Sequence, residues 1–261
     1  MRFWLGRFGL LLALVALLPA PARAQNTSFG AAVHLLVGQA PVRVTLTSGA
    51  TATRYYDAQV VTNRSYCAEA TASETEANPA DPTLTLFHAD QSTVFGTDSG
   101  ATTEPKAGIN ARVCFVASAT ETIYVQLTPA NASFENREYT LRFVETTLWT
   151  NWFFTGGDYS SFTLLRNTTN LPVVANLRWK AASGADVGTP VLSLSIPANG
   201  VVIYDARSIM SCPAPAACAA ASGSVEVAHS GSPEAIVGSQ TTLSGSTGLS
   251  FDTLFFQRRA W

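Results

Sequence analysis

Residues 139–154 read YTLRFVETTLWTNWFF, and this stretch contains the end of one strand pattern and the start of another. Apolar and polar side chains alternate from Tyr139 to Val144, which predicts a β-strand with one buried face. After Glu145 to Thr147 the pattern restarts on an aromatic cluster between Trp149 and Phe154. The stretch therefore predicts a seam between two β modules.

The extent of the second module is predicted from its aromatic residues. After the cluster at the seam, no comparable group occurs until residues 251–261, at the end of the sequence. We interpret the two clusters as the first and last strands of one module. This interpretation predicts one module over residues 25–145 and another over residues 146–261, each large enough for a core of its own.

Residues 1–24 have the pattern of a secretory signal peptide. Arg2 and Arg7 precede an apolar run at residues 10–18, and an Ala-Arg-Ala sequence ends at Ala24. The apolar run is shorter than the roughly 20 residues of a membrane-spanning helix, which favours cleavage over an uncleaved anchor. No later stretch is apolar for long enough to span a membrane. We therefore expect a secreted or periplasmic protein with no integral membrane segment after signal cleavage.

The charge of the mature chain argues against a nucleic-acid partner. Removing Arg2, Arg7 and Arg23 with the leader lowers the 16 basic residues to 13, against 18 acidic residues, which gives a formal charge of about −5. Proteins that bind nucleic acid instead carry basic patches, which neutralise the phosphate groups. Charged residues make up only 13% of the chain. Abundant Thr and Ser in their place suit β surfaces better than helical ones.

Short alternating runs separated by turn residues predict an all-β fold. In the first module Ile123, Val125 and Leu127 share one predicted face of a strand. The side chains between them should therefore be more exposed to solvent. The segment 96–100 is rich in turn residues and is predicted as a turn. Residues 29–37 are apolar without a clear period, so a strand and a single helical turn both stay open.

Six segments of the first module belong together, namely the strand patterns Tyr55–Val60, Ser65–Cys67, Asp81–Phe87, Thr122–Val125 and Tyr139–Phe143 and the turn-rich stretch Thr97–Gly100. As a set they resemble the bacterial pre-peptidase C-terminal domains, over about residues 40–145. Those domains are secreted, jelly-roll-like β-sandwiches attached to extracellular proteases and other exported enzymes. The resemblance implies a jelly-roll-like sandwich here and supplies no catalytic signature.

Three patterns mark the second module: a Phe-x-x-Leu-Arg-Asn-Thr strand from Phe162, a Gly-Ser-Val-Glu-Val-Ala-His strand ending at His229, and a closing Leu-Ser-Phe-Asp from Leu249. The set is similar to uncharacterised exported bacterial β domains, a resemblance that supplies no function. About seven strands in this span predict an immunoglobulin-like sandwich. The expected architecture is therefore two β-sandwich domains in tandem, the first jelly-roll-like and the second immunoglobulin-like.

The four cysteines are expected to form disulfides, because an even number in an exported chain favours pairing. Four cysteines permit three connectivities. Cys67 and Cys114 lie in the first module and Cys212 and Cys218 in the second, so pairing within modules is preferred because it staples each one independently. A zinc site at the second pair is disfavoured, since His229 alone cannot complete a tetrahedron.

No catalytic residue is predicted. The Asp-Ser-Gly sequence at 98–100 has the form of a serine-protease nucleophile loop, which also needs a general base and an orienting acid. His88 is the only histidine shortly before it, and the module is too small for a double barrel. His34, His88 and His229 each lie in or beside an apolar run, where a hydrogen-bonded structural histidine is expected.

Carboxylates near strand ends form the candidate metal site. Asp57, Asp81, Asp90 and Asp98 could supply oxygen ligands for calcium if the loops approach one another. The sequence contains no EF-hand and no calcium-binding nonapeptide repeat. A solvated acidic face is therefore the competing interpretation.

Trp149 and Trp152 form the candidate ligand-binding site. Exposed tryptophans stack on sugar rings, whereas an aromatic pair beside a seam also fills contacts between domains. We expect a non-catalytic exported protein that binds a polysaccharide or a cell-envelope protein, or that self-assembles. The alternatives are a calcium-dependent adhesion or carbohydrate-binding module and a hydrolase with an unrecognised site. No cofactor is expected apart from calcium.

We predict that the mature chain begins at Gln25 and carries the disulfides Cys67–Cys114 and Cys212–Cys218. Intact mass and peptide mapping of the exported protein check both statements. Free thiols throughout, or a crosslink between Cys67 and Cys212, would contradict the pairing.

Overall fold

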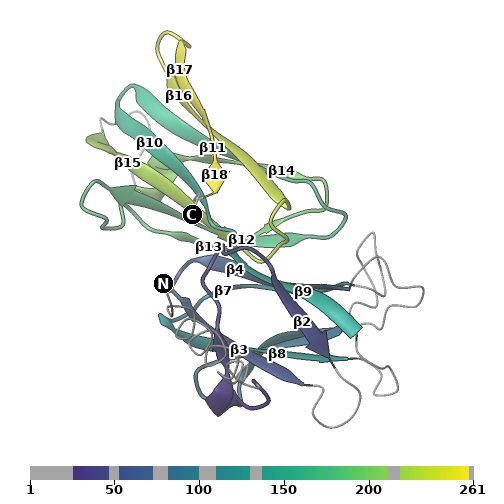
Figure 1. The fold of residues 1–261 in the computed structure, drawn as a ribbon. Coiled ribbons are helices and arrows are strands. Elements are labelled where there is room, and N and C mark those ends of the chain that lie inside the picture. The colour runs from purple at the N-terminus through teal and green to yellow at the C-terminus, as the bar shows by residue number, and fades with distance from the viewer. Residues whose placement is uncertain are drawn as a thin grey trace, which may run out of the picture.

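The computed structural model describes residues 26–46, 53–72, 82–99, 110–129, 137–210 and 218–258. These residues are built almost entirely from β-strands (Figure 1), which confirms the predicted all-β class. The helices in these ranges are short: the 3-10 helix η2 (Phe29–Ala31) and α1 (Ala206–Ile209). Neither has the length and hydropathy needed to cross a membrane.

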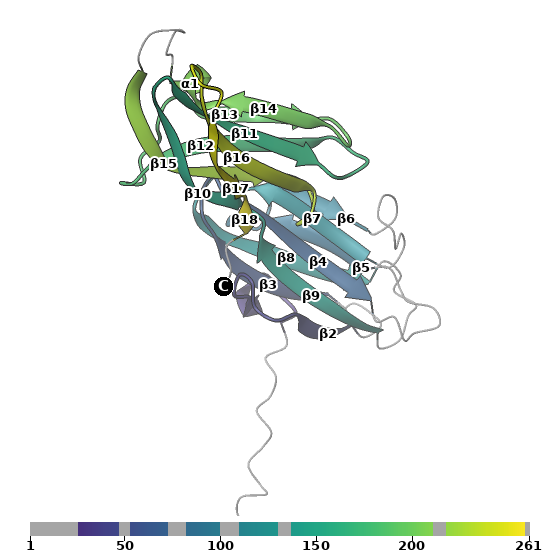
Figure 2. The same cartoon turned by 90° about the horizontal axis from the view of Figure 1, so that it is seen from above.

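The first half of the chain forms two sheets. In chain order its strands are β1 (Val33–His34), β2 (Val42–Leu46), β3 (Arg54–Val60), β4 (Ser65–Ala72), β5 (Pro82–Phe87), β6 (Val94–Asp98), β7 (Asn110–Val116), β8 (Glu121–Pro129) and β9 (Arg137–Glu145). Sheet A has the order β1-β3-β8-β5-β6, and sheet B has the order β2-β9-β4-β7. The two sheets lie face to face (Figure 2), with β6 and β7 as edge strands.

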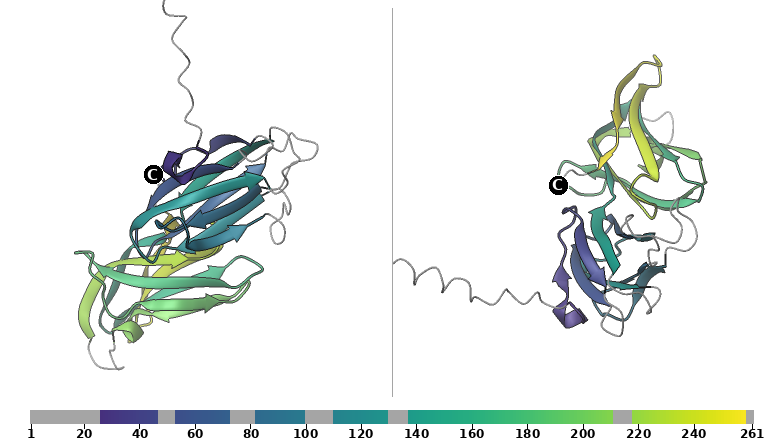
Figure 3. Two further views of the ribbon diagram at one scale, coloured as in Figure 1. Left: turned by 90° about the horizontal axis from the view of Figure 1, so that it is seen from below. Right: turned by 45° about the vertical axis from the view of Figure 1, so that its right-hand side comes forward.

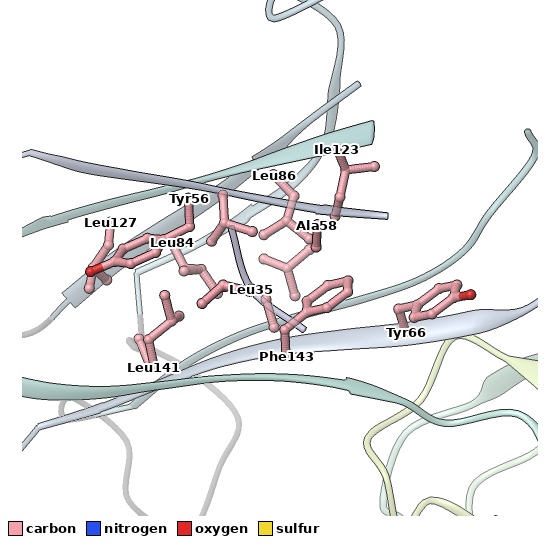
Figure 4. Packing of buried hydrophobic residues seen from close by; sticks show 14 of the residues in the cluster. Leu35, Tyr56, Ala58, Tyr66, Leu84, Leu86, Ile123, Leu127, Leu141 and Phe143 are labelled. Atoms are coloured by element: carbon pink, nitrogen blue, oxygen red, sulfur yellow. The ribbon is translucent and has the colours of Figure 1, made fainter. Parts of the chain in front are cut away.

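Alternation along the strands creates a core between sheets A and B. Ile123, Val125 and Leu127 of β8 are fully buried, which confirms the face predicted for them. Leu141 and Phe143 of β9 point toward them from the opposite sheet (Figure 4). Burying one such side chain stabilises the fold by about 1.5–3 kcal/mol, so this packing is a major contribution to the stability of the first half.

Cys67 and Cys114 form the predicted disulfide, which joins the neighbouring strands β4 and β7. The bond spans a sequence separation of 47 residues. In the loop-entropy description a closure of this length stabilises the fold by about 4 kcal/mol. The second pair stays a prediction, because Cys212 lies outside the described residues and Cys218 is described only in its backbone.

Local structure differs from the sequence interpretation at two places. The turn predicted at 96–100 is wrong for residues 96–98, which belong to β6. A Cβ atom on Gly96 would lie 3.0 Å from Cγ1 of Val113, so the small residue serves close packing within a strand rather than a turn. Residues 29–37, for which two structures were open, contain both a helical turn (η2) and a short strand (β1).

The second half forms a nine-stranded sheet that folds over on itself. Its strands are β10 (Leu148–Gly157), β11 (Tyr159–Asn167), β12 (Val173–Ala181), β13 (Val191–Ile196), β14 (Val201–Asp205), β15 (Cys218–His229), β16 (Ile236–Ser244), β17 (Ser250–Phe255) and β18 (Gln257–Arg258). One layer, sheet C, contains β13-β12-β15-β10 with β18, and the other, sheet D, contains β14-β11-β16-β17. Between β10 and β11 the pairing is limited to Gly156 and Tyr159.

A second core fills the space between sheets C and D. Phe153 and Trp179 contribute to it from sheet C, and Leu165 contributes from sheet D. The turn that carries the chain from one layer to the other contains Gly157 at φ +58°, a conformation that glycine adopts without steric cost. Each half of the chain therefore has its own cluster of buried apolar residues.

The two halves meet where β9 passes into β10 (Figure 3). Thr146 and Thr147, which connect these strands, are fully buried. The Thr146 N–H donates to the Ser65 carbonyl at 2.8 Å, and the Ser65 N–H donates to Oγ1 of Thr147 at 2.9 Å. The guanidinium of Arg64 lies 5.3 Å from the ring centre of Trp149. The seam is thus a packed contact.

One buried side chain, Asn167, holds the turn between β11 and β12. Its Nδ2 donates to the carbonyl oxygens of Leu171 at 2.7 Å, Pro197 at 3.0 Å and Ile196 at 3.1 Å. Its Oδ1 accepts from the N–H of Thr169 at 2.9 Å and from Oγ1 of the same residue at 2.8 Å. The turn is therefore fixed by hydrogen bonds rather than by apolar packing.

Asn167→Ala is predicted to lower the free energy of unfolding by about 3 kcal/mol, because it leaves buried carbonyl groups without a donor. Asn170→Ala, the same substitution at an exposed position of the same turn, should change it by less than about 0.5 kcal/mol. Urea denaturation of both variants gives the comparison. Equal effects would mean that the turn does not depend on Asn167.

Residues 25–145 and 146–261 are predicted to fold as separate units, because each contains its own core cluster. Each half expressed alone should unfold cooperatively in a thermal melt followed by circular dichroism. If neither half melts cooperatively, the buried seam belongs to a single core and the prediction is wrong.

Candidate functional site

The two predicted ligand-binding tryptophans lie on β10 in different surroundings. Trp149 lies in the seam, where the guanidinium of Arg64 covers its ring. Its Nε1 is buried and has no hydrogen-bond partner within the described part of the chain. Trp149 therefore contributes to the contact between the halves, and Arg64 covers one face of its ring.

Trp152 begins a series of aromatic rings outside the core. Its ring is nearly parallel to that of Phe154, with an interplanar angle of 10° and centroids 6.1 Å apart. Tyr159 continues the series at 6.2 Å from Phe154, tilted by 58°. All three side chains are partly exposed. We call Trp152, Phe154 and Tyr159 the aromatic row.

An irregularity in strand pairing places the row outside the core. Leu148 and Thr150 are buried, and strict alternation from them would bury Trp152 and Phe154 as well. The register of β10 against β15 shifts between Thr150 and Phe153, so Phe153 becomes the buried residue instead. The sequence indicated an aromatic cluster here, but Phe154 and Tyr159 were missed as site residues because a bulge leaves no clear sequence signal.

Small residues beside the aromatic row let its rings lie close to the strand. Phe154 lies opposite the exposed Ser222 of β15. A Cβ atom on Gly156 would lie 3.0 Å from Ala220 and 3.2 Å from Cζ of Phe154, so Gly156 lets the phenyl ring lie close to the strand. Ser222 and Ala220, the β15 residues shown beside Phe154 and Gly156, are thus both small.

Two of the predicted calcium ligands bind protein groups in separate places. Asp57 of β3 pairs with Nδ1 of His34 on β1. Asp98, at the end of β6, accepts a hydrogen bond from the N–H of Arg112 at 2.7 Å. Asp57 and Asp98 lie on strands near opposite ends of sheet A.

Asp90 stabilises its own turn between β5 and β6. The hydroxyl of Thr93 and the N–H groups of Ser92 and Thr93 donate to its carboxylate, which holds the pKa of Asp90 well below its usual range. Asp90 and Asp98 lie at opposite ends of β6, and Asp81 is outside the described residues. No group of three or more metal-binding side chains occurs within the described ranges. Calcium binding stays a prediction.

The Asp-Ser-Gly sequence and His88 are separated along the β5–β6 hairpin. His88 lies beside the turn, where its Nδ1 is 2.9 Å from Oε1 of Glu121 and its ring stacks on Phe95. Ser99 follows the other end of β6. A rise of about 3.3 Å per residue puts more than about 10 Å between them, too far for a nucleophile and its base.

A cleft of about 560 Å³ lies between the two halves. The first half lines it with residues 95–98 of β6 and 112–114 of β7, and the second half with the turns 168–173 and 230–232. Sequence reasoning missed this cleft, because its walls come from four segments that only the tertiary structure brings together.

No protein-family model matches the sequence, and no curated protein matches it either. Among solved structures, the chain is similar to the pre-peptidase C-terminal domain of a collagenase from Bacillus anthracis, at 13% identity and a TM-score of 0.34, over 43% of this chain and 93% of that domain. This is the same family that residues 40–145 resemble in sequence.

The chain is also similar to a candidate secreted protein of Parabacteroides distasonis, at 9% identity and a TM-score of 0.22, over 84% of this chain and 89% of that one. A β-glucuronidase of Bacteroides uniformis matches at 10% identity and a TM-score of 0.21, over 80% of this chain. This chain spans 26% of the length of that enzyme. At these identities the similarities concern the fold alone.

Proposed function

We propose that this protein is an exported, non-catalytic binding protein that holds a polysaccharide on the aromatic row of β10. The observation that carries the proposal is the pair of nearly parallel, partly exposed rings of Trp152 and Phe154. Aromatic rings attract the apolar C–H face of a sugar, because the contact removes apolar surface of both partners from water. Tyr159 extends the surface and adds a phenolic hydroxyl group.

The shape of the row favours a polymer over a single sugar. Three rings follow one another along β10 and the start of β11, so consecutive sugar units could each meet a ring. Asn151 and Ser222, both exposed beside the row, offer hydrogen-bonding groups to sugar hydroxyls. Stacking would thus supply affinity, and the polar neighbours would supply selectivity.

Export is supported by two independent features. Residues 1–24 have the signal-peptide pattern, and Cys67 and Cys114 form a disulfide, a bond that persists outside the reducing cytoplasm. We place the protein at the cell envelope or outside the cell. The facing sheets of each half support the jelly-roll-like and immunoglobulin-like assignments.

A binding role without catalysis is supported by the positions of the reactive side chains. His88 is engaged with Glu121, and His34 with Asp57, so both rings are parts of structural pairs. Ser99 lies at the far end of a strand from His88. These residues therefore do not form a nucleophile and base pair.

We predict that Trp152→Ala and Phe154→Ala each weaken glycan binding about tenfold, since losing one ring contact removes up to about 1.5 kcal/mol. A glycan array with the mature protein identifies the ligand, and calorimetric titration of the best glycan compares the variants. Failure of the wild-type protein to bind any glycan above background would contradict the proposal.

Two controls separate binding from folding. Trp149→Ala removes the same side chain three positions away on β10, and it should lower thermal stability while leaving glycan affinity unchanged, because Trp149 lies in the seam. Leu192→Ala removes an exposed apolar side chain elsewhere on sheet C and should change neither quantity. An equal loss of affinity in all four variants would mean that the effect is not specific to the row.

A further inference from the structure

The outer face of sheet D carries a group of exposed apolar side chains. Buried and exposed residues alternate along β11, where Leu165 belongs to the core and Leu164 points away from it. The same alternation on β14 and β16 places further exposed apolar residues on this side. Contiguous apolar patches on a surface mark sites of interaction. The exposed apolar residues of this face are Leu164, Val201, Ile203 and Val237.

The strand register arranges these side chains in rows that cross the sheet. Leu164 of β11 lies opposite Ile203 of β14, and this pair forms the middle row. Two residues further along β11, Arg166 lies between Val201 of β14 and Val237 of β16. The patch is therefore continuous over three neighbouring strands, with one cation inside it.

The row on the other side of the middle row ends in a carboxylate. Phe162 of β11 lies opposite Asp205 of β14, and both are partly exposed. The hydroxyl of Ser160 and the N–H of Arg207 donate to Oδ1 of Asp205. Among the described residues no donor contacts Oδ2, so this oxygen is available to a group from outside the chain.

The two charges of this face do not neutralise each other within one chain. Arg166 is exposed and forms no ion pair in the ranges that the structure describes. Four residue steps separate its row from the row of Asp205, which is about 13 Å along the strands. Covering Arg166 with an apolar surface would cost free energy unless that surface also supplied an acid. A surface that fits this face therefore combines apolar side chains with a carboxylate.

A second copy of the same face meets both requirements. Homodimers commonly have a two-fold axis and bury the same patch of each copy. With an axis along the strands, the Arg166 row would lie over its own symmetry mate, and the two cations would repel each other. With an axis across the strands at the middle row, each Arg166 row lies over the Asp205 row of the second copy. Charge complementarity thus selects the second arrangement.

We propose that two copies of this protein associate through the outer face of sheet D, with a two-fold axis that crosses the strands at Leu164 and Ile203. The facing sheets pack about 10 Å apart, as aligned sheets do. Arg166 of each copy donates to Oδ2 of Asp205 of the other copy, and Ile203 packs against its symmetry mate. Because the patch is only three strands wide, we expect a dissociation constant on the order of 10 μM.

Sedimentation velocity of the mature protein between about 1 and 300 μM tests the dimer. The wild type should change from monomer to dimer over this range. Ile203→Lys should weaken association at least about a hundredfold, because two lysines would face each other at the axis. Leu192→Lys, at an exposed apolar position of sheet C, should dimerise like the wild type. A wild type that stays monomeric throughout, or equal weakening by both variants, would overturn the proposal.

A neutral variant tests the charge pairing without disturbing the fold. Asp205→Asn keeps an oxygen that accepts from the N–H of Arg207 at the start of α1, so its thermal melt should match that of the wild type. It should dimerise about tenfold more weakly, because two ion pairs are lost. Glu138→Gln removes a carboxylate from the first half and should leave the dimer unchanged. Equal affinity of Asp205→Asn and the wild type would contradict the proposed axis.

Chemical crosslinking locates the axis directly. A bismaleimide linker that spans the roughly 10 Å between packed sheets should join Ile203→Cys to its symmetry mate. Val201→Cys should crosslink poorly, since its mate lies about 13 Å further along the strands. More efficient crosslinking of Val201→Cys than of Ile203→Cys would overturn the arrangement.

The dimer does not rest on the proposed binding of glycans. Ile203→Lys should leave the affinity for a short glycan unchanged, and Trp152→Ala should leave the dissociation constant of the dimer unchanged. The two variants therefore distinguish failure of the interface from failure of the aromatic row.

Discussion

The two-residue connection between β9 and β10 constrains how the rest of the molecule is arranged. Thr146 and Thr147 are fully buried and hydrogen-bonded to the main chain of Ser65, and these contacts hold the link against β4. Sheet C consequently begins directly against sheet B, and Arg64 meets Trp149 there. The same placement brings β6 and β7, which are edge strands among the described residues, opposite two turns of the second half, and the cleft lies between them.

Polar contacts join the two halves at the seam in addition to the contact between Arg64 and Trp149. Nη2 of Arg178 donates to Oδ1 of Asn63 at 2.9 Å, which ties sheet C to the turn before β4. Burial raises the pKa of Glu226, although the charges of Lys180 and Arg64 nearby oppose the shift. The folded state therefore binds this proton more tightly than the unfolded chain does. The stabilisation from Glu226 is present below its unfolded pKa and is lost as the pH rises through the raised value.

Several charged side chains connect neighbouring strands of the first half. Glu69 accepts from Nε of Arg112 and from Nε of Arg142, each at 2.8 Å, and so joins three strands of sheet B. His34 and His88 each pair with a carboxylate in the same way. The aromatic row is the surface that we propose for sugar binding, and stacking on its rings would supply the affinity.

Local sequence patterns predict the all-β class, most strands and the position where β9 ends and β10 begins, and they favour the pairing of Cys67 with Cys114 among three possible connectivities. These features depend on side-chain alternation and on residue types, which are local properties of the chain. That Phe153 is buried while Trp152 and Phe154 lie outside the core follows from the tertiary structure, because a register shift is fixed by the partner strand. The tertiary structure also decided that β6 and β7 are edges and that the turn held by Asn167 faces them, since these relations join segments far apart in the sequence.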